Sequence, residues 1–185
     1  MNTSYEIEIA GLKRELDFFP LTDKLQIAGF IMFGDTEITT ASAKELLKKA
    51  PDFDVIITAE SKGIPLAFEM SRLSGIEYVV ARKGPKLYMS EVVTVEVNSI
   101  TTEEKQILCL GGKEKKLLQG RRVLIVDDVI STGESLNALI TLVNECGGNI
   151  VGKMAVLAEG DAIGRHDVTY LAPLPLFDNE GNPVD

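Results

Sequence analysis

Two adjacent carboxylates followed by a small, hydroxyl-rich turn form the chemically most informative stretch of this chain. The stretch reads VLIVDDVISTGES, residues 123–135, and places Asp127 and Asp128 directly after an apolar run. Carboxylates accept hydrogen bonds, so the pair suits vicinal hydroxyl donors, a metal ion or a developing positive charge. Because successive strand residues face opposite sides, we expect that the two side chains do not share one proton.

The turn after the aspartates has the composition of an anion-binding site. A helix N-terminus presents unpaired backbone N–H groups and a partial positive charge, which together favour a phosphate group. A glycine lets the backbone come close to a ligand, and neighbouring hydroxyls add donors. The residues concerned are Ser131, Thr132, Gly133, Glu134 and Ser135. Taken alone, the same pattern also fits an ordinary strand followed by a capped helix.

Two further loops carry residues that suit a polyanionic ligand. Residues 60–63 read ESKG and combine a cation with a glycine, while Arg82, Lys83 and Lys86 form a basic cluster. Carboxylates for hydroxyls, a turn for one phosphate and cations for further negative charge belong together chemically. They describe a phosphorylated ribose that carries a diphosphate.

The elements that must position these loops alternate between strand and helix. Short β-branched runs predict buried strands, and apolar residues at helical spacing predict helices, the first capped by Thr39 or Thr40. The predicted strands span 54–59, 77–82, 122–126, 150–158 and 167–172, the helices 41–50, 66–74 and 134–146, and a hairpin 92–97 with 106–110. Residues 111–120 are read as a polar connection. This alternation predicts an α/β fold with a doubly wound, mainly parallel sheet flanked by helices, whose ligands bind at the carboxyl ends of the strands.

Length and composition bound the class of protein. With 185 residues, of which 45% are hydrophobic and 25% charged, the chain is expected to form one soluble domain, 1–185. The formal net charge of −9 argues against general binding to nucleic acid. No apolar run reaches the roughly 18 residues of a membrane helix, and the N-terminus lacks the pattern of a secretory signal, so a cytoplasmic protein is expected. Cys109 and Cys146 lack metal-ligand spacing and are predicted to be reduced core residues.

The stretch VLIVDDVISTGES resembles the signature of the type I phosphoribosyltransferases, in which an apolar strand, two acidic residues and a T-G turn open a helix. AESKGIP resembles that family's pyrophosphate loop, and ARKGPKLY the strand end that enters its mobile loop. RELDFFPLTD and LPLF resemble most closely the adenine phosphoribosyltransferase-like branch. Two departures stand out. The lid has no P-G-E-T-like pattern, which leaves a role for Glu91 open, and Glu134 adds a negative charge where glycine is commoner.

The resemblance implies a hood at about 1–40 and 160–185 that binds a base, and a flexible β-hairpin lid at about 83–110. The donor substrate would be 5-phosphoribosyl 1-diphosphate, with Mg²⁺ bound mainly through the diphosphate rather than through protein ligands. The acceptor would be a purine base, adenine being favoured, and the products a nucleoside 5′-monophosphate and diphosphate in purine salvage. A homodimer without nucleic-acid or membrane partners is expected.

The resemblance also implies residue roles. Asp127 and Asp128, the expected catalytic pair, would hold the ribose hydroxyls, and residues 131–135 the 5′-phosphate. The diphosphate would be contacted by Ser61, Lys62 and Gly63, with support from Arg82, Lys83 and Lys86. Phe19 and Phe177, with Phe18 and Leu176, would pack on the base, although all four also fit an ordinary core. Glu159 and Asp161 fit either a crevice or a solvated loop.

Two alternative functions use the same fold. One is a phosphoribosyltransferase acting on hypoxanthine, guanine, xanthine or a pyrimidine. The other is a non-catalytic regulator that senses phosphoribosyl diphosphate. The charge of −9 and the lack of an added DNA-binding segment in these 185 residues argue against the regulator. The intact acidic pair argues against a structural domain that has lost its site.

Overall fold

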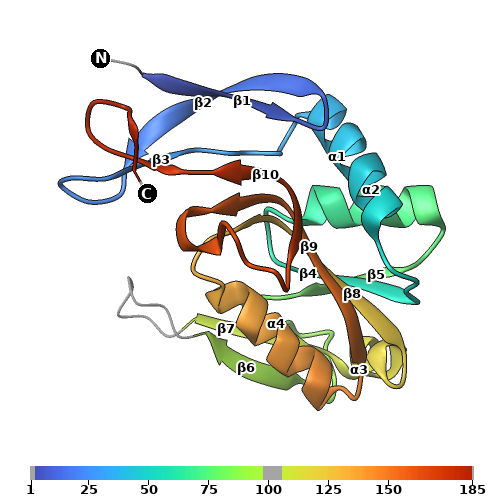
Figure 1. The fold of residues 1–185 in the computed structure, drawn as a ribbon. Helices are drawn as coiled ribbons and strands as arrows, with labels where there is room; N and C mark the ends of the chain where they lie inside the picture. The colour runs from blue at the N-terminus through green and yellow to red at the C-terminus, as the bar shows by residue number, and fades with distance from the viewer. Residues whose placement is uncertain (1–2, 98–105, 185) are drawn as a thin grey trace.

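A five-stranded parallel sheet forms the centre of the computed structural model, which describes residues 3–97 and 106–184 (Figure 1). The strand order is β10-β9-β8-β4-β5, and every neighbouring pair is parallel. The strands span Val55–Ala59 (β4), Tyr78–Ala81 (β5), Arg122–Ile130 (β8), Asn149–Glu159 (β9) and Thr169–Leu174 (β10). The α/β class and the parallel sheet predicted from the sequence are confirmed.

Helices cover both faces of this sheet. α1 (Thr36–Lys49) and α2 (Ile64–Ser74) pack on one face, and α3 (Gly112–Leu118) and α4 (Glu134–Glu145) pack on the other (Figure 1). Alternate residues of β8 join the two cores, because Leu124 and Val126 face the first while Val123 and Ile125 face the second. Burial on both faces explains why this strand reads as an uninterrupted apolar run.

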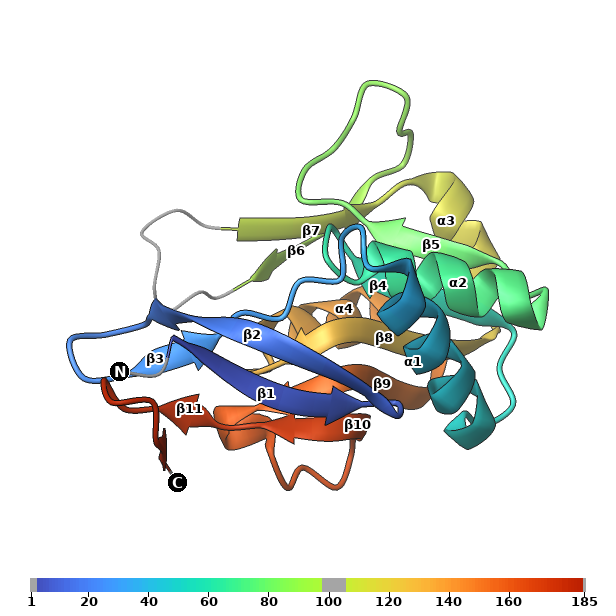
Figure 2. The same cartoon turned by 90° about the horizontal axis from the view of Figure 1, so that it is seen from above.

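A second, antiparallel sheet, the hood, lies beside the α1 side of the main sheet (Figures 1 and 2). Its order is β1-β2-β3-β11-β12, with strands Ser4–Ile9, Leu12–Pro20, Gln26–Ala28, Leu176–Phe177 and Pro183–Val184. Ile7, Ile9 and Phe177 belong to the same buried cluster as Leu124 of the main sheet, so hood and sheet share one core. Within 160–185, β10 belongs to the main sheet rather than to the hood.

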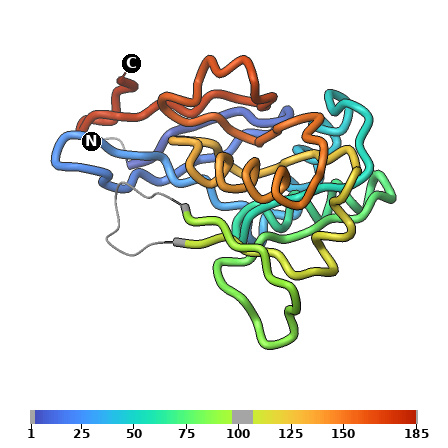
Figure 3. Tube along the Cα trace, turned by 90° about the horizontal axis from the view of Figure 1, so that it is seen from below, coloured from blue at the N-terminus to red at the C-terminus, as the bar shows by residue number. Residues whose placement is uncertain are grey.

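A two-stranded hairpin projects beside α4, as Figures 2 and 3 show. β6 (Val93–Val97) and β7 (Gln106–Leu110) pair antiparallel with Val93 opposite Leu110, which confirms the predicted hairpin. Cys109 forms an antiparallel bridge with Arg82, so β7 adjoins the end of β5. Part of the predicted lid, residues 98–105, lies outside the described residues.

Two local predictions are wrong. α1 begins at Thr36 rather than Ala41, because the Asp35 carboxylate accepts a 3.0 Å hydrogen bond from the Ile38 backbone N–H and caps the helix in place of Thr39 or Thr40. Residues 111–120 are not a simple connection but contain α3. The buried Leu118 packs this short, charged helix on the second core, and that contact is what the local composition does not show.

Both cysteines behave as predicted. Cys109 and Cys146 are buried free thiols, and burial raises the pKa of each. Across residues 3–97 and 106–184, no helix combines the length and apolar character that crossing a bilayer requires.

Candidate functional site

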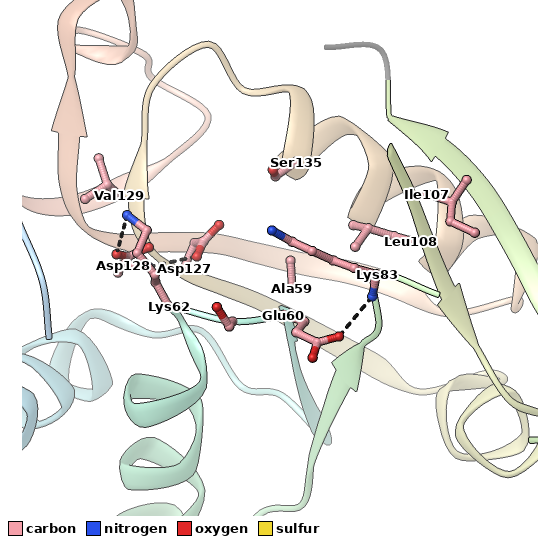
Figure 4. Close-up of a pocket in the computed structure, with 11 residues that line it drawn as sticks. Ala59, Glu60, Lys62, Lys83, Ile107, Leu108, Asp127, Asp128, Val129 and Ser135 are labelled. Carbon is pink, nitrogen blue, oxygen red and sulfur yellow. Dashed lines mark hydrogen bonds and ion pairs between the residues drawn. The ribbon is translucent and has the colours of Figure 1, made fainter. Parts of the chain in front are cut away.

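The loops that follow β4 and β8 meet where the strand order of the main sheet reverses. β4 and β8 are neighbours, but the chain continues from β4 to β5 on one side and from β8 to β9 on the other. Such a switch point opens a crevice at the carboxyl ends of the strands. A cavity of about 250 Å³ lies there (Figure 4). Its walls are Ala59, Glu60, Ser61, Lys62, Lys83, Ile107, Leu108, Asp127, Asp128, Val129 and Ser135.

The two aspartates line this cavity together although their side chains diverge (Figure 4). Asp128 is only 2% exposed, and its Oδ2 lies 3.1 Å from Lys62 Nζ. Among the described residues, this oxygen has no well-directed hydrogen bond, so it can accept one from a ligand hydroxyl. Asp127 Oδ1 accepts a 2.9 Å bond from the Asp128 backbone N–H. Burial, and then the charge of Asp128, hold the pKa of Asp127 well above its usual range.

The loop after β4 packs tightly against the acidic strand. Ser61 and Lys62 line the cavity, whereas Gly63 lies behind it and caps α2. A Cβ on Gly63 would overlap Thr58 Oγ1 and stand 2.8 Å from Asp127 Oδ1. Gly63 therefore supports the site by close backbone approach. The Glu60–Ser61 peptide bond in this loop is cis.

The predicted basic cluster divides into residues inside and outside the cavity. Lys83 lines the cavity, and Figure 4 shows its side chain extending toward Asp127. Arg82 instead pairs with Glu60, with Nε 3.1 Å from Oε2. Glu60 also accepts a 3.0 Å bond from the Lys83 backbone N–H, which is the main cause of its lowered pKa. Lys86 is exposed and is not part of the cavity wall.

The predicted phosphate turn forms a smaller hollow of about 60 Å³ at the start of α4. Residues 131–135 line it together with Asp127, and Ser135 lines the larger cavity as well, so the two spaces adjoin. Gly133 is the N-cap residue and has φ +82°, a conformation that glycine adopts without steric cost. The backbone N–H groups that open α4 thus lie next to the acidic pair.

The aromatic residues expected at the base lie in the hood. Phe177 is 0% exposed, and its ring centroid is 4.8 Å from those of Tyr5 and Phe18. A ring buried in this way has no surface for a base, so the predicted packing of Phe177 on the base is wrong and the core alternative holds. Phe19 is 46% exposed and packs over Gly29, where a Cβ would lie 2.6 Å from its ring. Its contact with a base stays a prediction.

Several contacts in this region are not evident from sequence patterns. Ile107 and Leu108 bring the hairpin into the cavity wall, and Glu60 orients Arg82. Glu159 ends β9 half-buried, and burial raises its pKa while the nearby Lys62 opposes that rise. These contacts join segments far apart in the chain, so local patterns carry little signal for them.

The fit of a magnesium ion depends on oxygen ligands. Asp127 and Asp128 offer carboxylate oxygens at the cavity, and Mg²⁺ prefers such ligands together with phosphate oxygens and water. Within the described ranges, no group of three or more His, Cys, Asp or Glu side chains is arranged to hold a metal. The two carboxylates fit a metal that also takes phosphate oxygens and water, and the binding of Mg²⁺ through a phosphate compound stays a prediction.

The fold and this cavity define a protein of the phosphoribosyl-transferring class, and comparison with known proteins agrees. The family model described as the phosphoribosyl transferase domain matches residues 35–179, and the chain belongs to this family. A hypoxanthine/guanine phosphoribosyltransferase of Methanococcus voltae is 34% identical over 157 residues, 82% of this chain and 80% of that protein. This membership confirms the predicted type I phosphoribosyltransferase resemblance.

Two further similarities come from a curated relative and from a solved structure. The purine biosynthesis transcriptional repressor PurR of Bacillus subtilis is 30% identical over 126 residues, 68% of this chain but 43% of the repressor. Among solved structures, the adenine phosphoribosyltransferase of Thermoanaerobacter pseudethanolicus has a TM-score of 0.66 at 22% identity and covers 92% of this chain and 95% of that one. At this identity the structural likeness shows the fold.

Proposed function

We propose that this protein transfers the 5-phosphoribosyl group from 5-phosphoribosyl 1-diphosphate to a purine base and releases diphosphate. The observation that carries the proposal is the convergence of the end of β8 and the loops that follow β4 and β8 on one space made of two adjoining cavities. The acidic pair, the turn at 131–135 and the Ser61–Lys62 loop supply acceptors, a phosphate site and a cation within that space. Family membership supports the same donor substrate.

The donor would be held at three points. The backbone N–H groups at the start of α4 would bind the 5′-phosphate. Asp127 and Asp128 would accept from the ribose hydroxyls, Asp128 through the oxygen that now faces Lys62. Lys62 and Lys83 would face the diphosphate, and Mg²⁺ bound to that diphosphate would neutralise part of its charge.

The reaction exchanges one bond at C1 of the ribose for another. The C1–oxygen bond to diphosphate breaks and the electron pair leaves with diphosphate. A ring nitrogen of the base forms the new bond, and the base releases its ring N–H proton to diphosphate or water. Positive charge develops at C1 meanwhile, and two neighbouring carboxylates stabilise it while the two lysines stabilise the leaving group. Holding donor and base in line lowers the reaction barrier further. Excluding water prevents hydrolysis of the donor.

Two classes of purine are candidates for the acceptor. Adenine is favoured by the two terminal sequence stretches, and the structural neighbours carry its name. Hypoxanthine and guanine are favoured by two relatives that are named hypoxanthine/guanine phosphoribosyltransferases. These relatives are 34% and 33% identical to this chain and match about four fifths of it. The deciding assay measures diphosphate release by purified protein with the donor, Mg²⁺ and one base at a time. The bases are adenine, hypoxanthine, guanine, xanthine, uracil and orotate. If none of these bases leads to diphosphate release, the proposed activity is overturned.

A double variant tests the assignment of the acidic pair. Asp127→Asn with Asp128→Asn should lower kcat/KM for the donor by at least about a hundredfold, because hydrogen bonds to charged groups are lost at two positions. Asp54→Asn is the matched control, since Asp54 pairs with Arg122 at the opposite end of β8 and is outside the cavity. Unchanged kinetics in the folded double variant would show that the carboxylates are misassigned.

The similarity to PurR supports one alternative, a regulator that binds the same donor without turnover. Such a protein would bind 5-phosphoribosyl 1-diphosphate, form no nucleotide with any base, and bind DNA with a strong salt dependence. The base panel combined with a DNA-binding titration at two salt concentrations separates the two functions.

A further inference from the structure

The phosphate turn lacks a cation of its own. Residues 131–135 read STGES, so the turn contributes hydroxyls and one carboxylate, that of Glu134. A helix N-terminus contributes only about half a positive charge, whereas a phosphate monoester carries about −1.5 to −2 at neutral pH. A phosphate bound here therefore needs positive charge from another part of the chain.

Arg165 supplies a guanidinium group at this turn. It lies in the segment between the 3₁₀ helix Gly160–Ala162 and β10, some thirty residues after the turn in the sequence. Its Nη1 stands 2.7 Å from the position that a Cβ on Gly133 would take. The guanidinium thus covers the glycine that caps α4, and any larger residue at 133 would displace it.

Asp167 fixes the orientation of this guanidinium. Arg165 donates from Nε and Nη2 to the two carboxylate oxygens of Asp167, both at 2.9 Å, so the Nη1 edge is the one left facing Gly133. Within the described residues, the hydrogen bonds of this guanidinium come from Nε and Nη2, and none comes from Nη1. Lys153 Nζ lies 2.6 Å from the same Asp167 carboxylate. Two cations therefore share one anion, so the group formed by Arg165, Lys153 and Asp167 carries one net positive charge.

We propose that Arg165 is a further phosphate-binding residue, whose Nη1 donates to the 5′-phosphate held at residues 131–135, and that Asp167 is its positioning residue. This inference rests on the proposed function. The bond to Asp167 also raises the pKa of Arg165, so the group stays charged at any pH at which the protein works. The arrangement accounts for the tolerance of Glu134, because a guanidinium on the turn offsets that carboxylate.

A purely structural role for Arg165 would be to pin its loop onto α4. The two roles differ in ligand binding. A pinning residue affects stability and all ligands alike, whereas a phosphate-binding residue affects those ligands that carry a 5′-phosphate. Ribose 5-phosphate carries that group, and inorganic diphosphate does not, so the pair of ligands separates the roles without any need for turnover.

The experiment measures dissociation constants of both ligands by calorimetry, with Mg²⁺ present, for the wild type and Arg165→Gln. We expect Arg165→Gln to weaken ribose 5-phosphate binding about tenfold or more, since a charge-assisted bond is lost, and to change diphosphate binding less than twofold. Arg165→Lys should recover part of the affinity, because lysine keeps the positive charge but lacks the planar guanidinium with its fixed N–H donors. Asp167→Asn should weaken ribose 5-phosphate binding in the same direction by a smaller factor.

The matched control is Arg122→Gln. Arg122 makes the same two-pronged contact, with Asp54 at 3.2 and 2.8 Å, but at the opposite end of β8. It should leave both dissociation constants unchanged. Equal ribose 5-phosphate affinity in the wild type and Arg165→Gln would overturn the inference and leave the proposed function standing. A wild-type protein that binds neither ligand would overturn both.

Discussion

At the scale of single residues, the site depends on contacts between segments that are far apart in the chain, such as the ion pair of Lys62 with Asp128. Asp127 and Asp128 are recognisable because their motif is contiguous. The ion pair between Lys62 and Asp128, and the guanidinium of Arg165 over Gly133, join loops that are far apart in the chain. No local spacing encodes such contacts, so only the folded chain shows that Lys62 meets Asp128 and that Arg165 meets Gly133.

The raised pKa of Asp127 predicts that this carboxylate destabilises the ligand-free protein. Between the ordinary aspartate pKa of about 3.9 and the higher folded-state value, the folded protein binds more protons than the unfolded chain. The free energy of unfolding therefore falls as pH rises through that window. Asp127→Asn removes this loss and keeps the Oδ1 that accepts from Asp128 N–H. We expect its melting temperature to exceed that of the wild type at pH 7.5, with a difference that shrinks toward pH 4.

The control for this prediction is Asp54, whose pKa is shifted in the opposite direction. Its partner Arg122 lowers the pKa of Asp54 to about 2, so this carboxylate stabilises the fold above about pH 4, and that contribution is lost as pH falls toward 2. Asp54→Asn should accordingly melt below the wild type at pH 7.5. Thermal melts of the three proteins at several pH values make the comparison. An Asp127→Asn variant that is less stable than the wild type at pH 7.5 would refute the burial argument.

Glu91 is predicted to be dispensable for the chemical step. Its backbone has φ +50°, and its Oε2 lies 3.1 Å from the position of a Cβ on Gly112, which places the carboxylate against the start of α3. It is not part of the cavity wall. Glu91→Gln should therefore keep kcat within about twofold, whereas loss of a general acid or base lowers it by roughly a hundredfold or more. Steady-state kinetics with a saturating donor and base give the answer.

At the scale of elements, strongly patterned segments are predictable and weakly patterned ones are not. β4, β8 and α4 follow from continuous apolar runs and helical spacing. The β1–β2 hairpin also has a signal, because buried Ile7 and Ile9 alternate with Glu6 and Glu8 ahead of a turn at Ala10–Gly11. α3 has none, since one buried leucine at its end determines its position. The phosphate turn is predictable because strand, turn and helix are contiguous.

The phosphate turn predicts a selective effect of a methyl group. Gly133 and Gly75 both have positive φ, +82° and +74°, so alanine at either should lower the free energy of unfolding by about 1 kcal/mol. A Cβ on Gly75 meets nothing within 4 Å, whereas one on Gly133 meets Arg165 Nη1. Gly133→Ala should therefore also raise KM for the donor by about tenfold, and Gly75→Ala should not. Denaturant melts and kinetics on both variants check this, and equal KM values would contradict it.

At the scale of the whole molecule, exposed apolar side chains border a hollow between the start of α1 and α2. Ile31, Phe33 and Phe68 are exposed, and the neighbours of Phe33 line a hollow of about 190 Å³ together with Phe68. Apolar patches of this kind mark interaction surfaces. We predict that a second copy of this chain covers the patch, which gives a molar mass of twice 20.1 kDa by light scattering. Phe33→Ser should shift the protein toward the monomer, and a wild-type monomer at micromolar concentration would contradict the homodimer.

The shared core of hood and main sheet predicts that the whole chain unfolds together. Phe177 is buried between Tyr5 and Phe18 and belongs to the cluster that includes Leu124 of β8. Phe177→Ala leaves a large cavity there and should lower the free energy of unfolding by about 3–5 kcal/mol. Because the hood has no separate core, far-UV circular dichroism and the fluorescence of tyrosines, including Tyr5 in the hood, should report one coincident transition. Two separate transitions would show instead that the hood folds as its own unit.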